Sequence, residues 1–208
     1  VQLLEMQYRM KRTIMQFSSN WFYGGKVLTA PEVEHRGILD YDCPMQWIDT
    51  PLEGAHEEFV GESFGRVNRQ EAKLCVQTLR DYYMKIGRAR ALDEQIDVGV
   101  ISPYRAQVQY LRQLVRSDEW LRPLRRLITI NTVDGFQGQE RDIIIISLVR
   151  ANDDGQIGFL ADLRRMNVAI TRARMKLIII GNADTLARHK FYKELHQYVM
   201  GLAEQPEI

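Results

Sequence analysis

Three short apolar runs stand out along the chain because no polar residues alternate with the apolar ones. They cover residues 98–101, 143–146 (extending towards 149) and 177–180. Strands that are buried on both faces have this pattern, as in a parallel sheet covered by helices. Weaker runs at residues 45–49 and 127–131 predict two further strands. The sequence therefore predicts a buried parallel sheet.

Segments with helical spacing lie between these runs. Asn68 followed by Glu71 resembles a capping box and predicts a helix that continues to about Tyr83. Apolar residues recur on one face over three further segments, residues 104–116, 162–173 and 184–200. Because strands and helices alternate through most of the chain, the predicted fold class is α/β.

Length and composition limit the class of protein. The chain has 208 residues, of which 45% are hydrophobic and 26% are charged, and this predicts one domain over residues 1–208 with a substantial core. No apolar stretch approaches the roughly 18 to 20 residues of a membrane span. Two cysteines, Cys43 and Cys75, are too few for a disulfide scaffold or a metal site built from cysteines. We expect a cytoplasmic protein without a membrane partner or its own metal ligands and, since it starts at Val1, a piece of a longer chain.

The formal net charge of +1 conceals an uneven distribution. Residues 31–62 contain nine acidic residues and one strong base, Arg36, so this segment carries −8 and the remaining residues carry +9. The acidic segment is either a solvated surface or a face that repels nucleic acid, and the basic surplus elsewhere permits an anionic partner. Glycines and acids over residues 52–66 predict a mobile loop, so residues 31–66 are an acidic, partly loop-like segment.

A complete ATPase site is not encoded in this sequence. The phosphate-binding pattern GxxxxGK[ST] is absent, because the only Gly-Lys pair, at Gly25 and Lys26, lacks the first glycine and the hydroxyl residue. No apolar run ends in an acidic pair that would hold magnesium.

Arginines near the end of the 162–173 helix offer a phosphate-binding surface. At about 100° per residue, Arg165, Ala169 and Arg172 share one stripe. The opposite face, turned to the core, consists of Leu163, Met166 and Ile170. Arginine is always charged and its planar fork binds phosphate oxygens, so this geometry suits a transferring phosphoryl group. A solvated helix face with surface ion pairs is the alternative.

The segment from Thr132 to Glu140 is a second candidate, because it joins two strands and contains Gly135 and Gly138. Glycines at such a junction let backbone N–H groups approach an anion. An ordinary glycine-containing turn is the alternative.

Two other segments offer contacts to a nucleotide or a nucleic acid. Tyr8 beside Arg9 suits a base face and a phosphate, although a packed tyrosine is equally compatible with the sequence. A basic stripe on the 104–116 helix suits a nucleic-acid backbone or a solvated surface, and it consists of Arg105, Gln109, Arg112 and Arg116.

Two patterns are interpreted as structural. Glu71-Ala72-Lys73 matches a nuclease-like pair, but it lies in a predicted helix and not on a strand. His189 and His196 have no acid or cysteine arranged with them, so we expect surface or packing roles.

Taken in order, the motifs are far more specific than they are singly. They are Gln7-Tyr8-Arg9-Met10 with Phe22-Tyr23-x-Gly25, Ser102-Pro103-Tyr104-Arg105-x-Gln107, Phe136-Gln137-Gly138-x-Glu140-x-Asp142, and Arg164-Arg165-x-Asn167-Val168-Ala169-x-Thr171-Arg172-Ala173-Arg174. This series, over roughly residues 3–185, resembles the second half of superfamily 1 helicases. The pattern is most similar to the branch that contains the nonsense-mediated-decay helicase and its DNA-acting relatives. The family commonly has His-Pro where this chain has Lys11-Arg12, which leaves the start of the next helix open.

The resemblance implies a fold and roles for particular residues. The family has two RecA-like domains with ATP between them, and this chain resembles the second: a RecA-like P-loop-NTPase fold without its own phosphate loop, with a parallel sheet flanked by helices on both faces. Arg9 and Arg172 would be arginine fingers for the γ-phosphate. Tyr8 would stack near the adenine, Glu140 would accept from the ribose hydroxyls, and Gly138 would offer its N–H to phosphate. Ser102 and Thr132 would contact the nucleic-acid backbone through their hydroxyls, and Arg105 of the basic stripe is the further candidate for this contact.

The resulting hypothesis is that this chain is the second motor domain of an ATP-dependent DNA or RNA helicase or translocase. ATP and Mg²⁺ would be held mainly by a first RecA-like domain of the same chain, and the track would be single-stranded DNA or RNA. The isolated domain would be inactive, because it lacks the phosphate loop and the magnesium-binding acids. The alternative is a non-enzymatic module that uses the same fold to bind nucleic acid or a protein partner.

Overall fold

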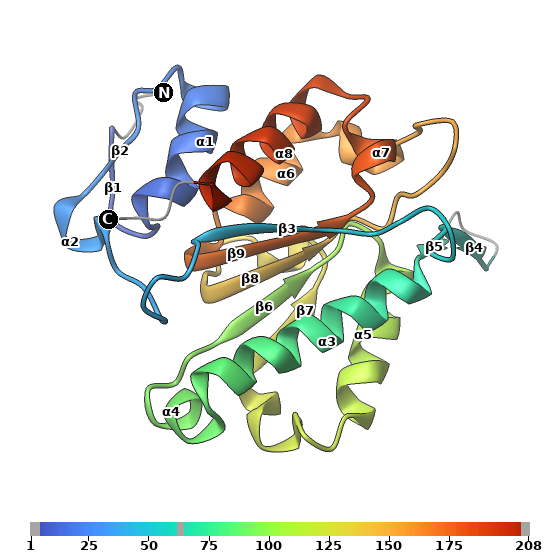
Figure 1. The fold of residues 1–208 in the computed structure, drawn as a ribbon, viewed down its shortest axis with the longest axis horizontal. Helices are drawn as coiled ribbons and strands as arrows, with labels where there is room; N and C mark the ends of the chain where they lie inside the picture. The colour runs from blue at the N-terminus through green and yellow to red at the C-terminus, as the bar shows by residue number, and fades with distance from the viewer. Residues whose placement is uncertain (1–4, 62–64, 205–208) are drawn as a thin grey trace.

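A five-stranded parallel sheet forms the centre of the molecule in the computed structural model, which describes residues 5–61 and 65–204 (Figure 1). The strand order is β3-β9-β8-β6-β7, and every neighbouring pair is parallel. The strands are β3 (Met45–Asp49), β6 (Val98–Ile101), β7 (Ile128–Asn131), β8 (Arg141–Ser147) and β9 (Ala173–Gly181). All five coincide with the apolar runs, so the predicted α/β class and parallel sheet are confirmed.

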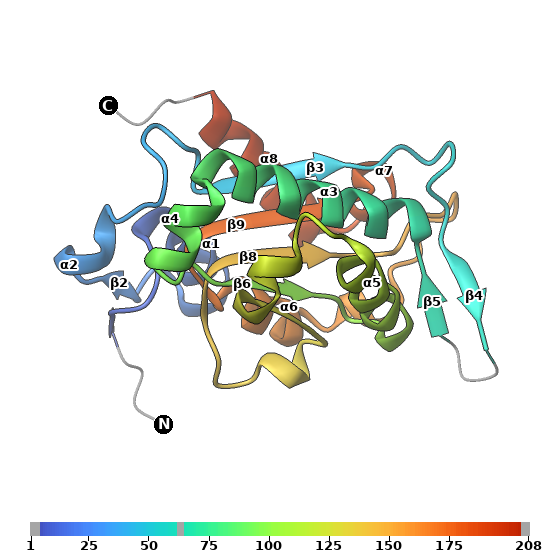
Figure 2. The ribbon, with the colours of Figure 1, turned by 90° about the horizontal axis from the view of Figure 1, so that it is seen from below.

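Helices cover both faces of the sheet, as Figures 1 and 2 show. One face carries α1 (Arg12–Tyr23), α6 (Leu163–Ile170) and α8 (Lys190–Ala203), and the other carries α3 (Arg69–Ile86), α4 (Arg88–Asp93) and α5 (Arg105–Ser117). Side chains alternate between the two cores along β8, because Ile144 and Ile146 face α1, α6 and α8 while Ile143 and Ile145 face α3 and α5. The continuous apolar runs therefore arise from strands that are buried on both sides.

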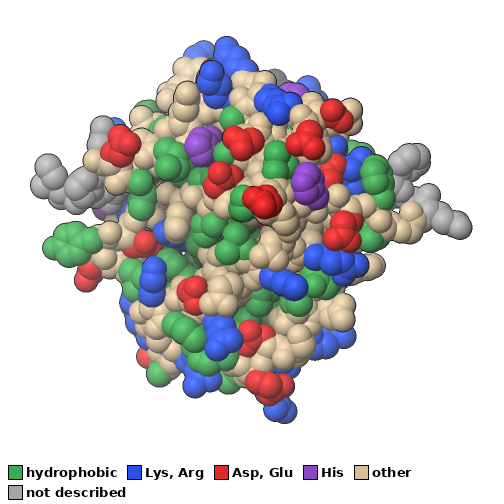
Figure 3. Space-filling view, turned by 45° about the vertical axis from the view of Figure 1, so that its right-hand side comes forward, with side chains coloured by type: hydrophobic (Ala, Val, Ile, Leu, Met, Phe, Trp, Pro, Cys, Tyr) green, Lys and Arg blue, Asp and Glu red, His purple; other side chains and the backbone are tan. Residues whose placement is uncertain are grey.

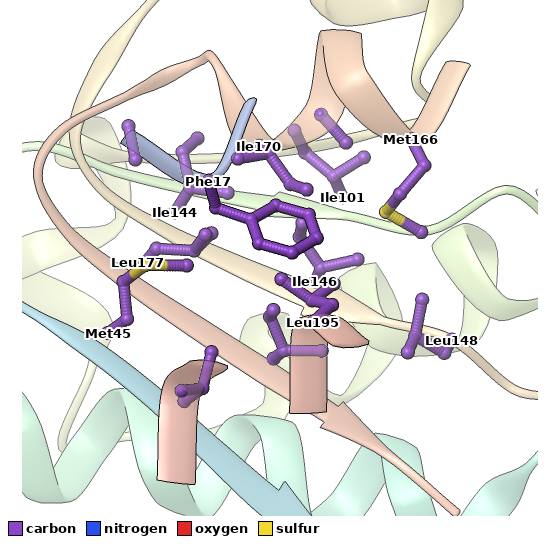
Figure 4. Close-up of a cluster of buried hydrophobic side chains, with 14 of the residues drawn as sticks. Phe17, Met45, Ile101, Ile144, Ile146, Leu148, Met166, Ile170, Leu177 and Leu195 are labelled. Carbon is purple, nitrogen blue, oxygen red and sulfur yellow. The ribbon is translucent and has the colours of Figure 1, made fainter. Parts of the chain in front are cut away.

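The core beneath α1, α6 and α8 closes around Phe17 (Figure 4). Ile170 and Met166 of α6, which were expected to face the sheet, are 0% and 5% exposed. Leu195 of α8 and Leu177 of β9 join the same cluster and are fully buried. The predicted apolar face of the 162–173 segment is thus confirmed, and it fixes α6 against the sheet.

The first turn of α3 confirms only part of the expected capping box. The Asn68 side chain accepts the backbone N–H of Glu71 at 3.0 Å, as a helix cap does. The Glu71 carboxylate does not return to Asn68. It is fully buried and accepts the Ser147 hydroxyl at 2.6 Å and the Val149 N–H at 2.7 Å. Glu71 therefore ties α3 to the carboxyl end of β8.

The expected mobile loop over residues 52–66 was wrong in part, because it contains a hairpin. β4 (Glu58–Val60) pairs antiparallel with β5 (Gly65–Val67), and residues 62–64 of the expected loop lie outside the described residues. The Glu57 carboxylate anchors the hairpin, since it pairs with Arg66 and with Arg150, at 2.8 Å in the latter case. A buried acid between two arginines holds this segment against the domain.

Smaller elements complete the chain. Near the amino terminus, β1 (Met6–Gln7) pairs parallel with β2 (Leu28–Thr29), followed by α2 (Pro31–Glu34). The start of α1, which the sequence left open, is Arg12. The expected helix over residues 184–200 is divided into α7 (Ala183–Leu186) and α8. The described residues also form the 3₁₀ helices η1 (Arg122–Leu127), η2 (Asp134–Phe136) and η3 (Gly158–Ala161).

The two patterns interpreted as structural have structural partners. Glu71 and Lys73 lie on helix α3. The His189 ring nitrogen lies 2.8 Å from the Gly155 carbonyl oxygen, and the His196 ring packs edge-on against Trp47. Within the described part of the chain, no helix is long and apolar enough to cross a membrane.

Candidate functional site

The amino ends of the two central strands bring the arginine-containing segments together. Arg141 opens β8 and donates its backbone N–H to the Arg172 carbonyl at 3.0 Å, while Arg141 and Ala173 are partners in the β8–β9 register. The loop before β8 and the turn before β9 therefore lie side by side. This arrangement places Glu140 beside Arg172 and Arg174, although they are more than thirty residues apart in sequence.

The loop before β8 is held by one buried ring. Phe136 is 0% exposed, and its ring lies against β6 at Gly99, where an added Cβ would come within 2.9 Å of two of its carbons. Only glycine leaves room for this close approach. Gly138 follows with a positive φ of 76°, and a Cβ placed there would meet no described atom within 4 Å. The loop therefore presents the Gly138 backbone openly and leads Glu140 to the start of β8.

Arg9 reaches the same place from the amino-terminal segment that follows β1. The Gln7 side chain accepts the backbone N–H groups of Arg9 and Met10 at 2.9 and 2.7 Å. The Arg9 guanidinium forms an ion pair with Glu140 and donates to the Thr171 carbonyl at 3.2 Å. Arg9 thus contacts both the loop before β8 and the turn before β9.

One carboxylate joins the cluster. Glu140 accepts Arg9 on one oxygen and Arg174 on the other, at 3.1 Å for Arg174. Partial desolvation raises the pKa of Glu140, but the hydrogen bonds from Arg174 and Arg9 outweigh it, and the net effect is a lowered pKa. Arg174 also pairs with Asp142 at 2.9 Å. Glu140 is consequently ionised at neutral pH and holds two guanidiniums.

Arg172 lies beside this pair and forms no ion pair with a carboxylate among the residues that the structure describes. Its guanidinium donates to the Val168 and Gln139 carbonyls, both at 3.1 Å. Desolvation and, next, the positive charge of Arg9 lower the pKa of Arg172, and Glu140 opposes this only in part. Two arginines held close to each other, with one carboxylate to share, are a site that an additional anion would stabilise.

The expected stripe of Arg165, Ala169 and Arg172 was wrong in its geometry. Ala169 is fully buried, and Arg165 pairs with Asp134 and Asp162 at 3.5 and 3.6 Å. The reason is that α6 ends at Ile170, so the helical spacing does not extend to Arg172. Arg172 reaches the cluster from the turn after the helix.

Tyr8 precedes the arginine cluster and is 67% exposed. Its ring is therefore available to a flat partner, in contrast to the packed tyrosine that the sequence left open. Exposure alone does not assign the partner, and stacking on adenine stays a prediction.

The residues expected to contact nucleic acid lie at the opposite, carboxyl ends of the strands. Ser102 follows β6 and Thr132 follows β7, and the Ser102 N–H donates to the Asn131 carbonyl. The Ser102 hydroxyl is buried and accepts the Tyr104 N–H at 3.5 Å, whereas Thr132 is half-buried and accepts the Gly135 N–H at 3.4 Å. In this conformation Thr132 is accessible to a ligand and Ser102 supports the turn.

The basic stripe on α5 is exposed, but one member has a structural partner. Arg105, Gln109 and Arg116 are exposed, while the Arg112 guanidinium donates twice to the Ile130 carbonyl on edge strand β7, at 2.7 and 3.0 Å. Seen from the side where β4, β5 and α7 lie, acidic, basic and apolar side chains are intermixed (Figure 3). Contact of Arg105 with nucleic acid stays a prediction.

Two groups in the site were not singled out by sequence reasoning. Arg174 was part of a motif but was given no role, and Arg36 was noted only as the lone base of an acidic segment. The only available signal for Arg174 was its position two residues after Arg172 at the start of a strand. The described residues contain no group of three or more His, Cys, Asp or Glu side chains that could hold a metal ion.

Comparison with known proteins identifies clear relatives. Residues 1–184 match the family described as AAA domain. The chain is 34% identical to DNA polymerase alpha-associated DNA helicase A of Saccharomyces cerevisiae over 95% of its own length and 30% of that protein. It is 40% identical to the regulator of nonsense transcripts 1 homolog of Drosophila melanogaster, covering 92% of this chain and 16% of the relative. It is 36% identical to the ATP-dependent helicase NAM7 of Saccharomyces cerevisiae, over 92% of this chain and 20% of that protein. The chain thus spans less than a third of these relatives.

Proposed function

This chain belongs to the AAA-domain family of superfamily 1 helicases, in the branch of the nonsense-mediated-decay helicase, and we propose that it is the second motor domain of a nucleic-acid-dependent ATPase. The observation that carries the proposal is the convergence of Arg9 and Arg172 beside Glu140 at one end of the sheet. Three segments far apart in sequence build this cluster, which supports a common task for them.

The task proposed for the two arginines is to bind the γ-phosphate of ATP held on a first RecA-like domain. Guanidiniums stabilise the charge on a transferring phosphoryl group, and the described partners of the Arg172 guanidinium include carbonyls but no carboxylate. Arg9 is paired with Glu140 before phosphate arrives, so phosphate must compete for it. The Gly138 N–H offers a further donor to phosphate.

Tyr8 and Glu140 are proposed to bind the nucleoside. The exposed Tyr8 ring offers a stacking surface for adenine, and the ionised Glu140 carboxylate offers an acceptor for ribose hydroxyls. Mg²⁺ would be held mainly by the first domain and by the phosphates of ATP. The isolated chain is therefore expected to hydrolyse no ATP.

Single-stranded DNA or RNA is proposed to bind at the opposite end of the strands, near Thr132 and Arg105. The segment from Thr132 to Glu140 connects the two ends of the sheet, and its central residue Phe136 is buried. Closure of the two motor domains on ATP would therefore move the nucleic-acid contacts together with the arginines. Alternating closure and opening would shift the domains along the strand.

The test uses the chain that carries both motor domains, with Arg9→Ala and Arg9→Lys. Removal of an arginine finger lowers turnover by about 1,000-fold. Lysine restores little, because a point charge does not reproduce the guanidinium fork. Affinity for a single strand stays unchanged, since Arg9 lies at the other end of the sheet. Turnover by Arg9→Ala equal to wild type overturns the proposal, and absence of hydrolysis in wild type with strand binding intact favours a binding module.

A further inference from the structure

Arg36, the only strong base among residues 31–62, reaches the arginine cluster. It follows α2, which lies beside β1 and β2 at the left of Figure 1. Its Nη2 donates to the backbone carbonyl of Arg9. The acidic segment therefore supplies one cation to the site, although the rest of its charge is negative.

The surroundings of Arg36 make its placement costly. Desolvation and, next, the positive charge of Arg174 lower the pKa of Arg36, while Asp142 and Glu140 act in the opposite direction. The Nε atom of Arg36 is buried and has no hydrogen-bond partner among the described residues. A buried, unpartnered donor on a cation near other cations opposes folding, so the hydrogen bond from Arg36 to the Arg9 carbonyl forms in spite of this cost.

The Arg9 backbone is consequently held on both sides. Gln7 accepts its N–H at 2.9 Å, and Arg36 donates to its carbonyl. A third contact, the ion pair with Glu140, involves the Arg9 side chain and not its backbone. If phosphate takes the Arg9 guanidinium from Glu140, the two backbone contacts are unaffected and keep the Cα of Arg9 in place.

We propose that Arg36 is a positioning residue for ATP hydrolysis, which fixes the Arg9 backbone so that the guanidinium meets the γ-phosphate in the productive geometry. This inference rests on the proposed function, because it needs Arg9 to act on phosphate. A misplaced catalytic group lowers the rate of the chemical step more than it lowers substrate affinity. Arg36 thereby gives the acidic segment a role in turnover.

The experiment measures kcat and KM for ATP in the chain with both motor domains. Arg36→Ala removes the hydrogen bond, and Arg36→Lys keeps a cationic donor. Arg12→Ala is the matched control: Arg12 is exposed, pairs with Glu34 at 2.6 Å close to Arg36 in sequence, and its loss changes the charge equally. Arg9→Ala is measured in parallel, and circular dichroism confirms that each variant is folded.

We expect Arg36→Ala to lower kcat by about 10- to 100-fold with KM within about twofold of wild type. Arg36→Lys recovers part of the loss, and Arg12→Ala behaves as wild type. If Arg9→Ala loses turnover while Arg36→Ala keeps it, the inference fails and the proposed function stands. If Arg9→Ala itself keeps turnover, the proposed function fails. If Arg36→Ala does not fold, Arg36→Lys and Arg36→Gln replace it in the test. If both of these variants have the kcat and the KM of wild type, the inference is overturned.

Discussion

The Glu140 carboxylate forms an ion pair with Arg9, which lies 131 residues earlier in the chain. The same carboxylate accepts Arg174 at 3.1 Å, so one acid joins the amino-terminal segment to the start of β9. Under the proposed function, Glu140 also accepts from the ribose of ATP. The ribose of ATP and the Arg9 guanidinium would therefore compete for the same carboxylate, so that nucleotide binding favours the release of Arg9.

Glu140→Gln tests this shared use. The amide keeps the shape of the side chain but loses its charge, and hydrogen bonds to charged groups are the stronger ones. We expect KM for ATP to rise about tenfold and the preference for ATP over 2′-deoxy-ATP to decrease, because the neutral amide oxygen accepts a ribose hydroxyl more weakly than the carboxylate does. Steady-state hydrolysis of both nucleotides measures this. Glu34→Gln, which removes the partner of exposed Arg12, serves as the control, and an undiminished preference in Glu140→Gln excludes a ribose contact.

The contact between Gly99 and Phe136 predicts a stability effect. A Cβ at Gly99 would lie 2.7 Å from the Ile144 side chain and 2.8 Å from the Phe136 ring, so Gly99→Ala should lower the free energy of unfolding by about 1–3 kcal/mol. Gly201→Ala in α8 is the control, where a Cβ meets no described atom within 4 Å and helix propensity predicts a gain of about 0.5–1 kcal/mol. Urea unfolding compares the two, and equal shifts would contradict the packing argument.

The buried Glu71 carboxyl predicts a pH effect on stability. Burial raises its pKa from the ordinary 4.5 to about 7, and hydrogen bonds from Ser147 and the Val149 backbone offset the burial only in part. Because the folded protein binds this proton more tightly than the unfolded chain, the contribution of Glu71 is most favourable below pH 4.5 and is lost as pH rises to about 7.

Glu71→Gln removes this titration. The free energy of unfolding of the variant minus that of wild type should rise with pH between about 4.5 and 7, by on the order of 3 kcal/mol. Urea unfolding at a series of pH values measures the difference. Exposed Glu94, paired with Arg90, supplies the control variant Glu94→Gln. A difference that is independent of pH over this range would show that the pKa of Glu71 is not raised in the folded protein.

The strands β6, β8 and β9 were predictable because they are apolar runs buried on both faces, while the edge strands β3 and β7, which are only partly buried, gave weaker runs. The hairpin of β4 and β5 was not predictable, because three-residue strands carry little periodicity and the segment is held by a buried contact of Glu57 with Arg150, 93 residues away. The two-residue strands β1 and β2 were missed for the same reason. Short elements fixed by distant partners leave little local signal.

Those residues of the candidate site that belong to sequence motifs were predictable, and those that only tertiary contacts bring to the site were not. Arg9, Glu140 and Arg172 came from the ordered motifs, and the structure brings them together. Arg165 was misplaced because helical spacing was extended past the end of α6 at Ile170. Arg36 belongs to no motif, and tertiary contacts place it at the site: its hydrogen bond to the Arg9 carbonyl and its proximity to Arg174 and Glu140.

The most direct test of the central claim is the ATPase rate of the chain with both motor domains, with and without single-stranded DNA or RNA, for wild type and Arg172→Ala. The account predicts that one polymer stimulates wild type and that Arg172→Ala lowers the stimulated rate by about 1,000-fold while it binds that polymer with unchanged affinity. Hydrolysis by Arg172→Ala at the wild-type rate would contradict it.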